Sequence, residues 1–234
     1  MDLAFYGGKD PRDLPRYTYV DAARATNVPA TTIAAWVRGQ DYRRKHDVAR
    51  FRPVIKRPDP RDTRLSFNNL LETHVLRALR EVHEVQLRTV RRAIDDAERR
   101  HGIQRLLISA QLRSSGGQLF LDSYFHLVSL DAASQWAMRS VLKQYLTRVR
   151  LDDAAPEEAP EFFPIPRNPR HRDRDLILLS PLVAFGQPII KRVGVSTRAI
   201  AERVNAHEDP ASVMGDYGLN EDEFDEAVRY ETAA

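Results

Sequence analysis

The feature that most constrains this chain is the stretch "TYVDAARATNVPATTIAAWVRG", which predicts two short helices over residues 21–26 and 31–38. The segment "NVPA" between them has the Asn and Pro of a tight turn. A helix-turn-helix needs this arrangement, with a second helix whose first residues can reach base edges. Thr31 and Thr32 begin the second helix, where short hydroxyl groups can meet phosphates or bases. We therefore predict a DNA-binding unit, with Trp36 packed in its core.

A long basic segment follows directly, in residues 40–64. A loop of this length inside a domain is usually functional, and we interpret it as a cationic wing beside the helix pair; a solvated loop is the alternative. Its cations are Arg43, Arg44, Lys45, Arg50, Arg52, Lys56, Arg57, Arg61 and Arg64. The side chains predicted to contact DNA are Thr31, Thr32, Arg38, Arg43, Arg44, Lys45, Arg61 and Arg64.

The rest of the chain predicts a mainly α fold with small β elements. Apolar residues at helical spacing indicate helices over 66–85 and 86–102, the first capped by Ser66 or Asn68. The Leu-rich and aromatic stretch "QRLLISAQLRSSGGQLFLDSYFHLVSL" is split by "SSGG", and we read it as a β-hairpin. A helix follows it. Near the end, short strands precede three short helices, which form a trihelical, helix-turn-helix-like unit.

These patterns divide the chain into four parts. We predict a winged helix-turn-helix domain in 1–103 and a hairpin plus helix in 104–155, the second a candidate for dimerisation. Residues 156–175, rich in Pro and Arg, are predicted to be an extended linker. Residues 176–234 form the trihelical domain.

Charge separates the two ends of the chain. The net charge of +3 is the sum of +8 in residues 1–110, +2 in residues 111–195 and −7 in residues 196–234, which implies different partners for the two ends. The chain has no cysteine, no phosphate-binding Gly loop and no protease or hydrolase motif. We expect no catalytic residue, metal or cofactor, and neither a membrane span nor a signal peptide, hence a cytoplasmic protein.

Residues 17–95 resemble the winged helix-turn-helix of MerR-type regulators. The match rests on "YTYVDAARATNVPATTIAAWVRG" and "RLSFNNLLETHVLRALREVHEVQLRTVRRAI". Ala34 stands where that family often has an arginine that contacts phosphate, so the resemblance implies that the loop cations hold the DNA backbone. It also implies a dimer on operator DNA.

The tail carries a second resemblance. "SPLVAFGQPIIKRVGVSTRAIAERVNAHEDPASVMGDYGLNEDEFDEAVRYE" is similar to a trihelical domain of VapB-type antitoxins, which accompany PIN-like ribonuclease toxins. Both resemblances together imply an antitoxin that also represses its own operon. The alternatives are a MerR-like transcription regulator without a toxin partner and an enzyme with a site that matches no motif.

The last helix should separate an apolar edge from an acidic face. We expect Phe224 to be a core residue and the acid-rich first turns to face a partner rather than DNA, because phosphates would repel them. The predicted toxin-binding side chains are Arg167, Arg170, Arg172, Arg174, Glu223 and Glu226. The four arginines could meet carboxylates of the toxin.

Overall fold

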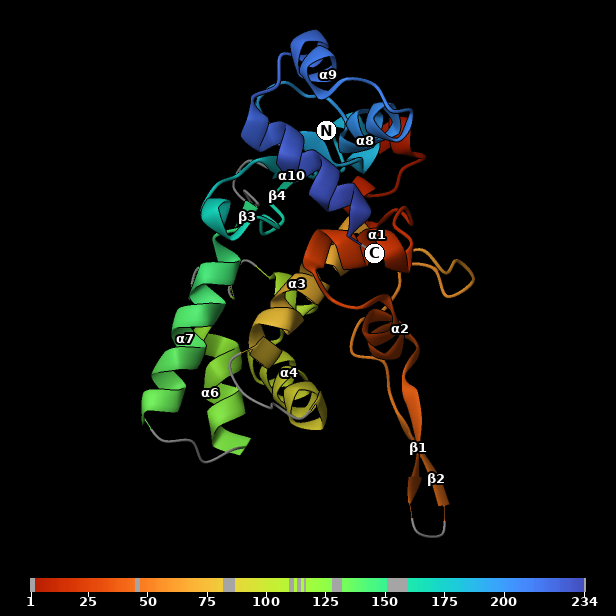
Figure 1. Ribbon diagram of the computed structural model, residues 1–234. Coiled ribbons are helices and arrows are strands. Elements are labelled where there is room, and N and C mark those ends of the chain that lie inside the picture. The colour runs from red at the N-terminus through yellow and green to blue at the C-terminus, as the bar shows by residue number, and fades with distance from the viewer. Residues whose placement is uncertain are drawn as a thin grey trace.

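The computed structural model is mainly helical, with three two-stranded antiparallel sheets (Figure 1). It describes residues 3–44, 47–81, 87–109, 112, 115, 117–127, 132–150 and 160–233. The predicted fold class is therefore confirmed. One hydrophobic cluster runs from Tyr17 near the front of the chain to Tyr230 in its last helix.

The helices described are α1 (Tyr19–Thr26), α2 (Ala30–Arg38), α3 (Phe67–Glu81), α4 (Leu87–His101), α6 (Gln118–Leu127), α7 (Ala132–Leu146), α8 (Thr197–Asn205), α9 (Pro210–Tyr217) and α10 (Glu221–Thr232). The strands are β1 (Gln40–Arg44), β2 (Asp47–Phe51), β3 (Val149–Arg150), β4 (Glu161–Phe162), β5 (Ile177–Leu178) and β6 (Ile189–Ile190). Short 3₁₀ turns include Leu3–Tyr6, Pro11–Asp13, Leu106–Ile108, Pro169–His171 and Ala184–Gly186.

Local signals in the sequence build the α1–α2 pair. Thr18 and Asp21 form a reciprocal capping box, with each side chain accepting the backbone N–H of the other residue (3.1 and 2.8 Å). Asn27 ends α1 in the left-handed conformation, which asparagine tolerates better than most residues. Ile33 and Trp36 of α2 are buried, as the sequence predicts.

The segment after α2 is a hairpin rather than the long loop that the sequence suggests. β1 and β2 pair antiparallel, with Gln40 opposite Phe51 and Arg44 opposite Asp47. The hairpin projects away from the rest of the molecule, as a wing would (Figure 1). The segment that follows β2 is held against α2 by hydrogen bonds from the N–H groups of Val54 and Ile55 to the carbonyl of Trp36 (2.8 and 3.2 Å).

The predicted β-hairpin of residues 104–130 is wrong. The described part of this stretch holds a 3₁₀ turn and the helix α6, which packs against α4. Phe120, Leu121 and Tyr124 of α6 are buried, so apolar side chains cover most of its circumference. A short buried helix and a buried strand give the same apolar run, and periodicity cannot separate them. The helix predicted next is confirmed as α7, which packs against α3.

The predicted extended linker is also corrected, in its described part from residue 160. Phe162 and Phe163 are fully buried, and Phe162 forms an isolated β-bridge with Leu179 beyond the supposed linker. The N–H groups of Phe162 and Leu179 each donate to the carbonyl of the other residue (2.9 Å both). This segment therefore belongs to the core.

The predicted trihelical tail is confirmed as α8, α9 and α10, preceded by the β5–β6 pair. Asp209 caps α9, and Asn220 forms a capping box with Glu223 at the start of α10. α10 packs on α8 and also contacts α1 of the front domain (Figure 1). The tail thus packs directly against α1 of the helix-turn-helix.

Candidate nucleic-acid interface

The second helix of the pair presents a polar face. Thr31 and Arg38 are exposed and Thr32 is half-buried, while Ile33 and Val37 point into the core. The guanidinium of Arg38 lies over the ring of Tyr19, 5.2 Å from its centroid. This geometry suits a helix that lies in a groove with its first residues toward the bases.

The predicted wing cations fall into two groups. Arg43 and Arg44 lie in β1, so the backbone carries them onto the projecting hairpin; their side chains, and Lys45 as a whole, lie outside the described residues. Arg61 and Arg64 are exposed on the return from the hairpin, and Arg64 pairs with Asp62 (2.6 Å). The structure thus places α2 and the hairpin next to each other in the chain and in space (Figure 1).

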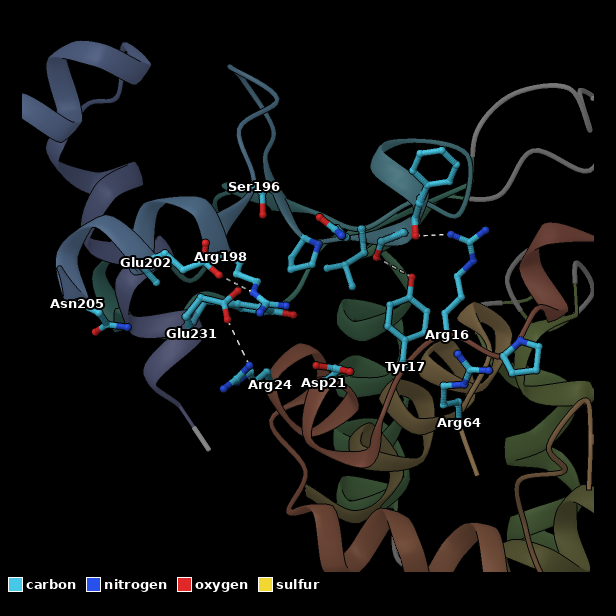
Figure 2. Close-up of a pocket in the computed structure, with 18 residues that line it drawn as sticks. Arg16, Tyr17, Asp21, Arg24, Arg64, Ser196, Arg198, Glu202, Asn205 and Glu231 are labelled. Carbon is cyan, nitrogen blue, oxygen red and sulfur yellow. Dashed lines mark hydrogen bonds and ion pairs between the residues drawn. The ribbon is translucent and has the colours of Figure 1, made fainter. Parts of the chain in front are cut away.

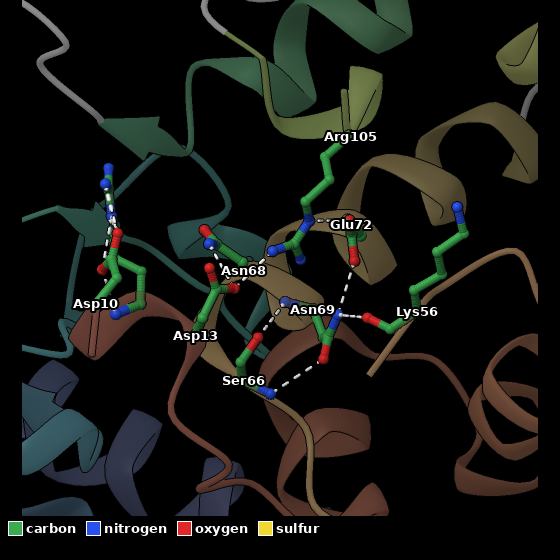
Figure 3. Close-up of polar contacts among 9 residues, drawn as sticks. Asp10, Asp13, Lys56, Ser66, Asn68, Asn69, Glu72 and Arg105 are labelled. Atoms are coloured by element: carbon green, nitrogen blue, oxygen red, sulfur yellow. Dashed lines mark hydrogen bonds and ion pairs between the residues drawn. The ribbon is translucent and has the colours of Figure 1, made fainter. Parts of the chain in front are cut away.

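A polar network fixes the base of the wing (Figure 3). Ser66 and Asn69 cap α3 reciprocally, each accepting the backbone N–H of the other at 3.2 Å, which confirms Ser66 as the cap. The amide of Asn69 also donates to the carbonyl of Lys56 (2.9 Å) and to Glu72 (2.8 Å). Because Lys56 lies in the segment that leads from β2 back to α3, Asn69 holds this segment against the start of α3.

Arg105 completes this network from the segment that follows α4. Its guanidinium meets Glu72 at 2.9 Å and Asp13 at 2.5 Å, and Asn68 donates to the same Asp13 oxygen (2.9 Å). Burial raises the pKa of Glu72, and the charge of Arg105 opposes that rise. Sequence reasoning missed this cluster, because its members come from four separate segments; the "SFNN" cap motif was the only local signal.

Arg167 was predicted to bind a toxin, but the structure turns it inward. Its guanidinium donates to the carbonyl of Arg24 (2.7 Å) and to the side chain of Asn27, at the C-terminal end of α1. Such a contact satisfies carbonyls that a helix end leaves without partners. Arg167 therefore ties the segment before the tail to the first helix of the helix-turn-helix.

The predicted exposed acidic face does not include Glu223 and Glu226, which are buried. Glu226 accepts the backbone N–H groups of Arg167 (2.6 Å) and Asn168 (3.2 Å); burial raises its pKa, and these two bonds counteract the rise. Glu223 pairs with Arg192 at 2.6 Å. Burial disfavours its charge, but the Arg192 and Asn220 hydrogen bonds hold the pKa of Glu223 below its usual value.

The other three predicted cations stay at the surface. Arg170, Arg172 and Arg174 are exposed, and Arg174 pairs with Asp222 of α10. Phe224 is only half-buried, and the fully buried positions of α10 are instead Ala227 and Tyr230, beside the two glutamates. The apolar edge of α10 is thus rotated from the predicted one.

A cleft lies between the helix-turn-helix and the tail (Figure 2). Its volume is about 750 Å³, and its walls carry Arg16, Tyr17 and Arg24 on one side and α8 and Glu231 on the other. Arg24 pairs with Glu231 across it (3.2 Å), and the hydroxyl of Tyr17 donates to the carbonyl of Gly186 (2.9 Å).

Within the described residues, no group of three or more His, Asp or Glu side chains could hold a metal ion. No helix there is long and apolar enough to cross a membrane.

Comparisons with known proteins fit this geometry. Residues 15–94 match a family described as "Putative DNA-binding HTH domain", and residues 177–230 match one described as "Protein of unknown function (DUF433)". The chain is 24% identical over 232 residues to "Putative antitoxin VapB45" of Mycobacterium tuberculosis, covering 92% of this chain and 93% of that protein. The crystal structure of Rv2018 from the same organism has a TM-score of 0.61, at 20% identity, over 92% of this chain and 98% of that one.

The matches agree with the division of the molecule seen in the structure. The front of the chain is a helix-turn-helix domain, and its match ends within α4. The second match begins at β5 and ends within α10, so it covers the trihelical tail. Nearly the whole chain, including the middle helices, is similar to a protein that carries the name of an antitoxin.

Proposed function

We propose that this protein is the antitoxin of a type II toxin–antitoxin pair, which binds and inhibits a PIN-like ribonuclease and represses its own operon. The observation that carries the proposal is the end-to-end similarity to a named antitoxin in a chain whose front is a helix-turn-helix with an exposed α2 face. DNA binding and partner binding then belong to opposite ends of the molecule.

On DNA, the α2 face enters the major groove and the β1–β2 hairpin follows the backbone, in the manner of MerR-like winged domains. The protein binds as a homodimer. Its operator is then palindromic or pseudo-palindromic, because a two-fold protein reads a two-fold site. Thr31 and Thr32 contribute to sequence preference, and Arg38 and the hairpin cations contribute affinity for phosphate.

The experiment combines two measurements on the full-length chain. Fluorescence anisotropy with the DNA upstream of its own gene should show tight binding, and Thr31→Ala should change the ranking of operator variants more than it changes non-specific affinity. Co-expression with the ribonuclease encoded by the adjacent gene should restore growth and give a complex that co-purifies. Growth arrest that persists despite abundant soluble protein would contradict the antitoxin function.

A second candidate is a MerR-like regulator without a toxin, and the 750 Å³ cleft between the helix-turn-helix and the tail favours it. A small ligand in this cleft would contact both α1 and α8. Operator binding that responds to a small molecule, in a strain where no neighbouring nuclease exists, would favour this function over the first.

A further inference from the structure

Exposed apolar side chains lie together beside the cleft, which Phe185 helps to line. Phe5 and Phe185 are 68% and 66% exposed, and their rings stack with centroids 6.5 Å apart. Val183 is 36% exposed and lies in the same turn as Phe185. We call Phe5, Val183 and Phe185 the aromatic patch. Clustered exposed aromatics mark interaction sites on soluble proteins far more often than single ones do.

The turn that carries Phe185 is held in an unfavourable backbone conformation. Ala184, Phe185 and Gly186 have successive φ angles of 48°, 52° and 78°, and the left-handed region disfavours the first two residues. Only glycine fits at the third position, because a Cβ there would lie 2.5 Å from the Tyr17 hydroxyl. Strain of this kind persists where the surroundings fix it, and it accumulates at functional sites.

Two residues of the helix-turn-helix domain fix the turn (Figure 2). Arg16 donates to the carbonyl of Phe185, and Tyr17 donates to the carbonyl of Gly186. These two hydrogen bonds hold the backbone from which the exposed ring of Phe185 projects. An exposed aromatic side chain next to an arginine is a composition found at interface hot spots.

Charge indicates the kind of partner. Arg16 binds a neutral carbonyl, and the structure as described gives it no ion pair, whereas Arg24 and Arg198 of the same cleft pair with Glu231 and Glu202. A second copy is disfavoured, because a two-fold contact centred on the patch would bring two Arg16 side chains together. DNA is disfavoured, because the N-terminus lies at the other end of the molecule from the β1–β2 hairpin (Figure 1).

We propose that the aromatic patch is the docking surface for the ribonuclease, which presents an apolar recess beside a carboxylate that meets Arg16. This inference rests on the proposed antitoxin function and adds the surface and the chemistry of the contact. It also gives the tail a partner-binding role that does not involve the buried acids of α10.

The test uses three variants of the full-length chain and the ribonuclease encoded by the adjacent gene. Phe185→Asn removes the ring, and asparagine tolerates the left-handed conformation, so the turn survives. Phe5→Gln removes the other ring without altering the turn. Trp136→Gln is the matched control, because Trp136 of α7 is 70% exposed and lies outside the patch. Biosensor affinities and molecular mass in solution are measured for each, with circular dichroism to verify folding.

We expect each patch variant to lose at least ten-fold in affinity for the ribonuclease and Trp136→Gln to lose less than two-fold, with operator binding unchanged in all three. Parent-like affinity in both patch variants would overturn the docking surface while leaving the antitoxin function in place. A change of oligomeric state in the patch variants, without loss of affinity, would overturn it in favour of self-association. Failure of the parent chain to bind the ribonuclease would overturn the antitoxin function itself.

Discussion

Buried carboxylates decide how the parts of this molecule meet. Glu226 is 1% exposed, and in the part of the chain that the structure describes it has no ion pair; two backbone N–H groups donate to it instead. Glu72 is also buried, at 6% exposed, and is paired with Arg105. A charge without water is stable only when donors replace the lost hydration. Each of these side chains therefore fixes the segment that supplies its donors: the loop before the tail for Glu226, and the base of the wing for Glu72.

Removing the side chain of Glu226 should destabilise the protein. Glu226→Ala leaves the N–H groups of two half-buried residues without their acceptor, and a buried group left in this way costs about 1–3 kcal/mol. We expect a loss of about 3 kcal/mol in urea unfolding and faster amide exchange at Arg167 and Asn168. The control is Glu221→Ala in the exposed first turn of α10, which should cost below about 1 kcal/mol. Equal losses in the two variants would show that the loop contact contributes nothing.

The Glu72–Arg105 pair predicts a dependence on pH. Burial raises the folded-state pKa of Glu72 above its unfolded value, so folding favours the protonated form. Stability linked to such a group is full below the unfolded pKa and is lost as pH rises through the folded pKa. Arg105→Met removes the compensating charge and raises that pKa further. We therefore expect the variant to lose about 3 kcal/mol at pH 7.5 and clearly less at pH 5.

Urea unfolding at the two pH values measures this effect. Adding Glu72→Gln to Arg105→Met removes the titrating group, so the loss relative to the parent should no longer shrink at low pH through this site. If Arg105→Met lowers the free energy of unfolding by the same amount at pH 5 and at pH 7.5, Glu72 keeps its charge without Arg105.

Among the elements, those with local signals were predictable. The α1–α2 pair, α3, α4 and the tail helices carry apolar residues at helical spacing, and α1, α3, α9 and α10 also carry side-chain caps; the structure has each of these helices. The prediction for the α6 stretch was wrong because large apolar residues dominate this helix, and its exposed polar positions, Asp122 and His126, are too few to give a clear helical period. The prediction of an extended linker was wrong because its prolines and charged residues dominate the sequence pattern around Phe162 and Phe163. The burial of these two residues depends on β5 and on other partners distant in the sequence.

Residues of the candidate site could likewise be predicted where the signal is local and could not where their partners are distant in the sequence. Thr31 and Arg38 could be placed from the helix pattern alone, and they lie on the exposed face of α2. The roles of Glu223, Glu226 and Arg167 could not, because the partners that place them in the fold lie between 31 and 143 residues away in the chain. A run of acids in a sequence shows charge, and only the fold shows which of them water can reach.

The β1–β2 hairpin should account for part of the affinity for DNA. Replacing Arg43 and Arg44 with Ala should weaken binding to all sequences alike, because phosphate contacts carry no sequence information. The slope of log affinity against log salt should fall by about 0.9 for each phosphate that the variant no longer neutralises. Arg99→Ala/Arg100→Ala is the matched control, since it removes the same charge from the exposed side of α4. An unchanged slope in the hairpin variant would exclude the hairpin from the interface.

At the scale of the whole molecule, the front and the tail make direct contacts that the predicted division of the sequence into four parts does not suggest. Arg167 caps α1, Arg24 pairs with Glu231 of α10, and Tyr17 holds the Gly186 carbonyl. The hydrophobic cluster is continuous across these contacts. The contacts between α1 and α10 therefore connect the tail directly to the helix-turn-helix.

Continuity of the core predicts that the two ends unfold together. Trp36 lies in the core of the front domain and Trp136 is the other tryptophan of the chain, so Trp136→Phe leaves Trp36 as the single fluorescent reporter of helix-turn-helix unfolding. Ile200 is fully buried in α8 of the tail, and Ile200→Ala should cost about 2–5 kcal/mol. In the Trp136→Phe background, this tail substitution should lower the urea midpoint reported by Trp36, and circular dichroism should give the same midpoint. If the Trp36 midpoint stays unchanged while part of the helical signal disappears earlier, the tail unfolds by itself and the contacts between α1 and α10 do not couple the two ends.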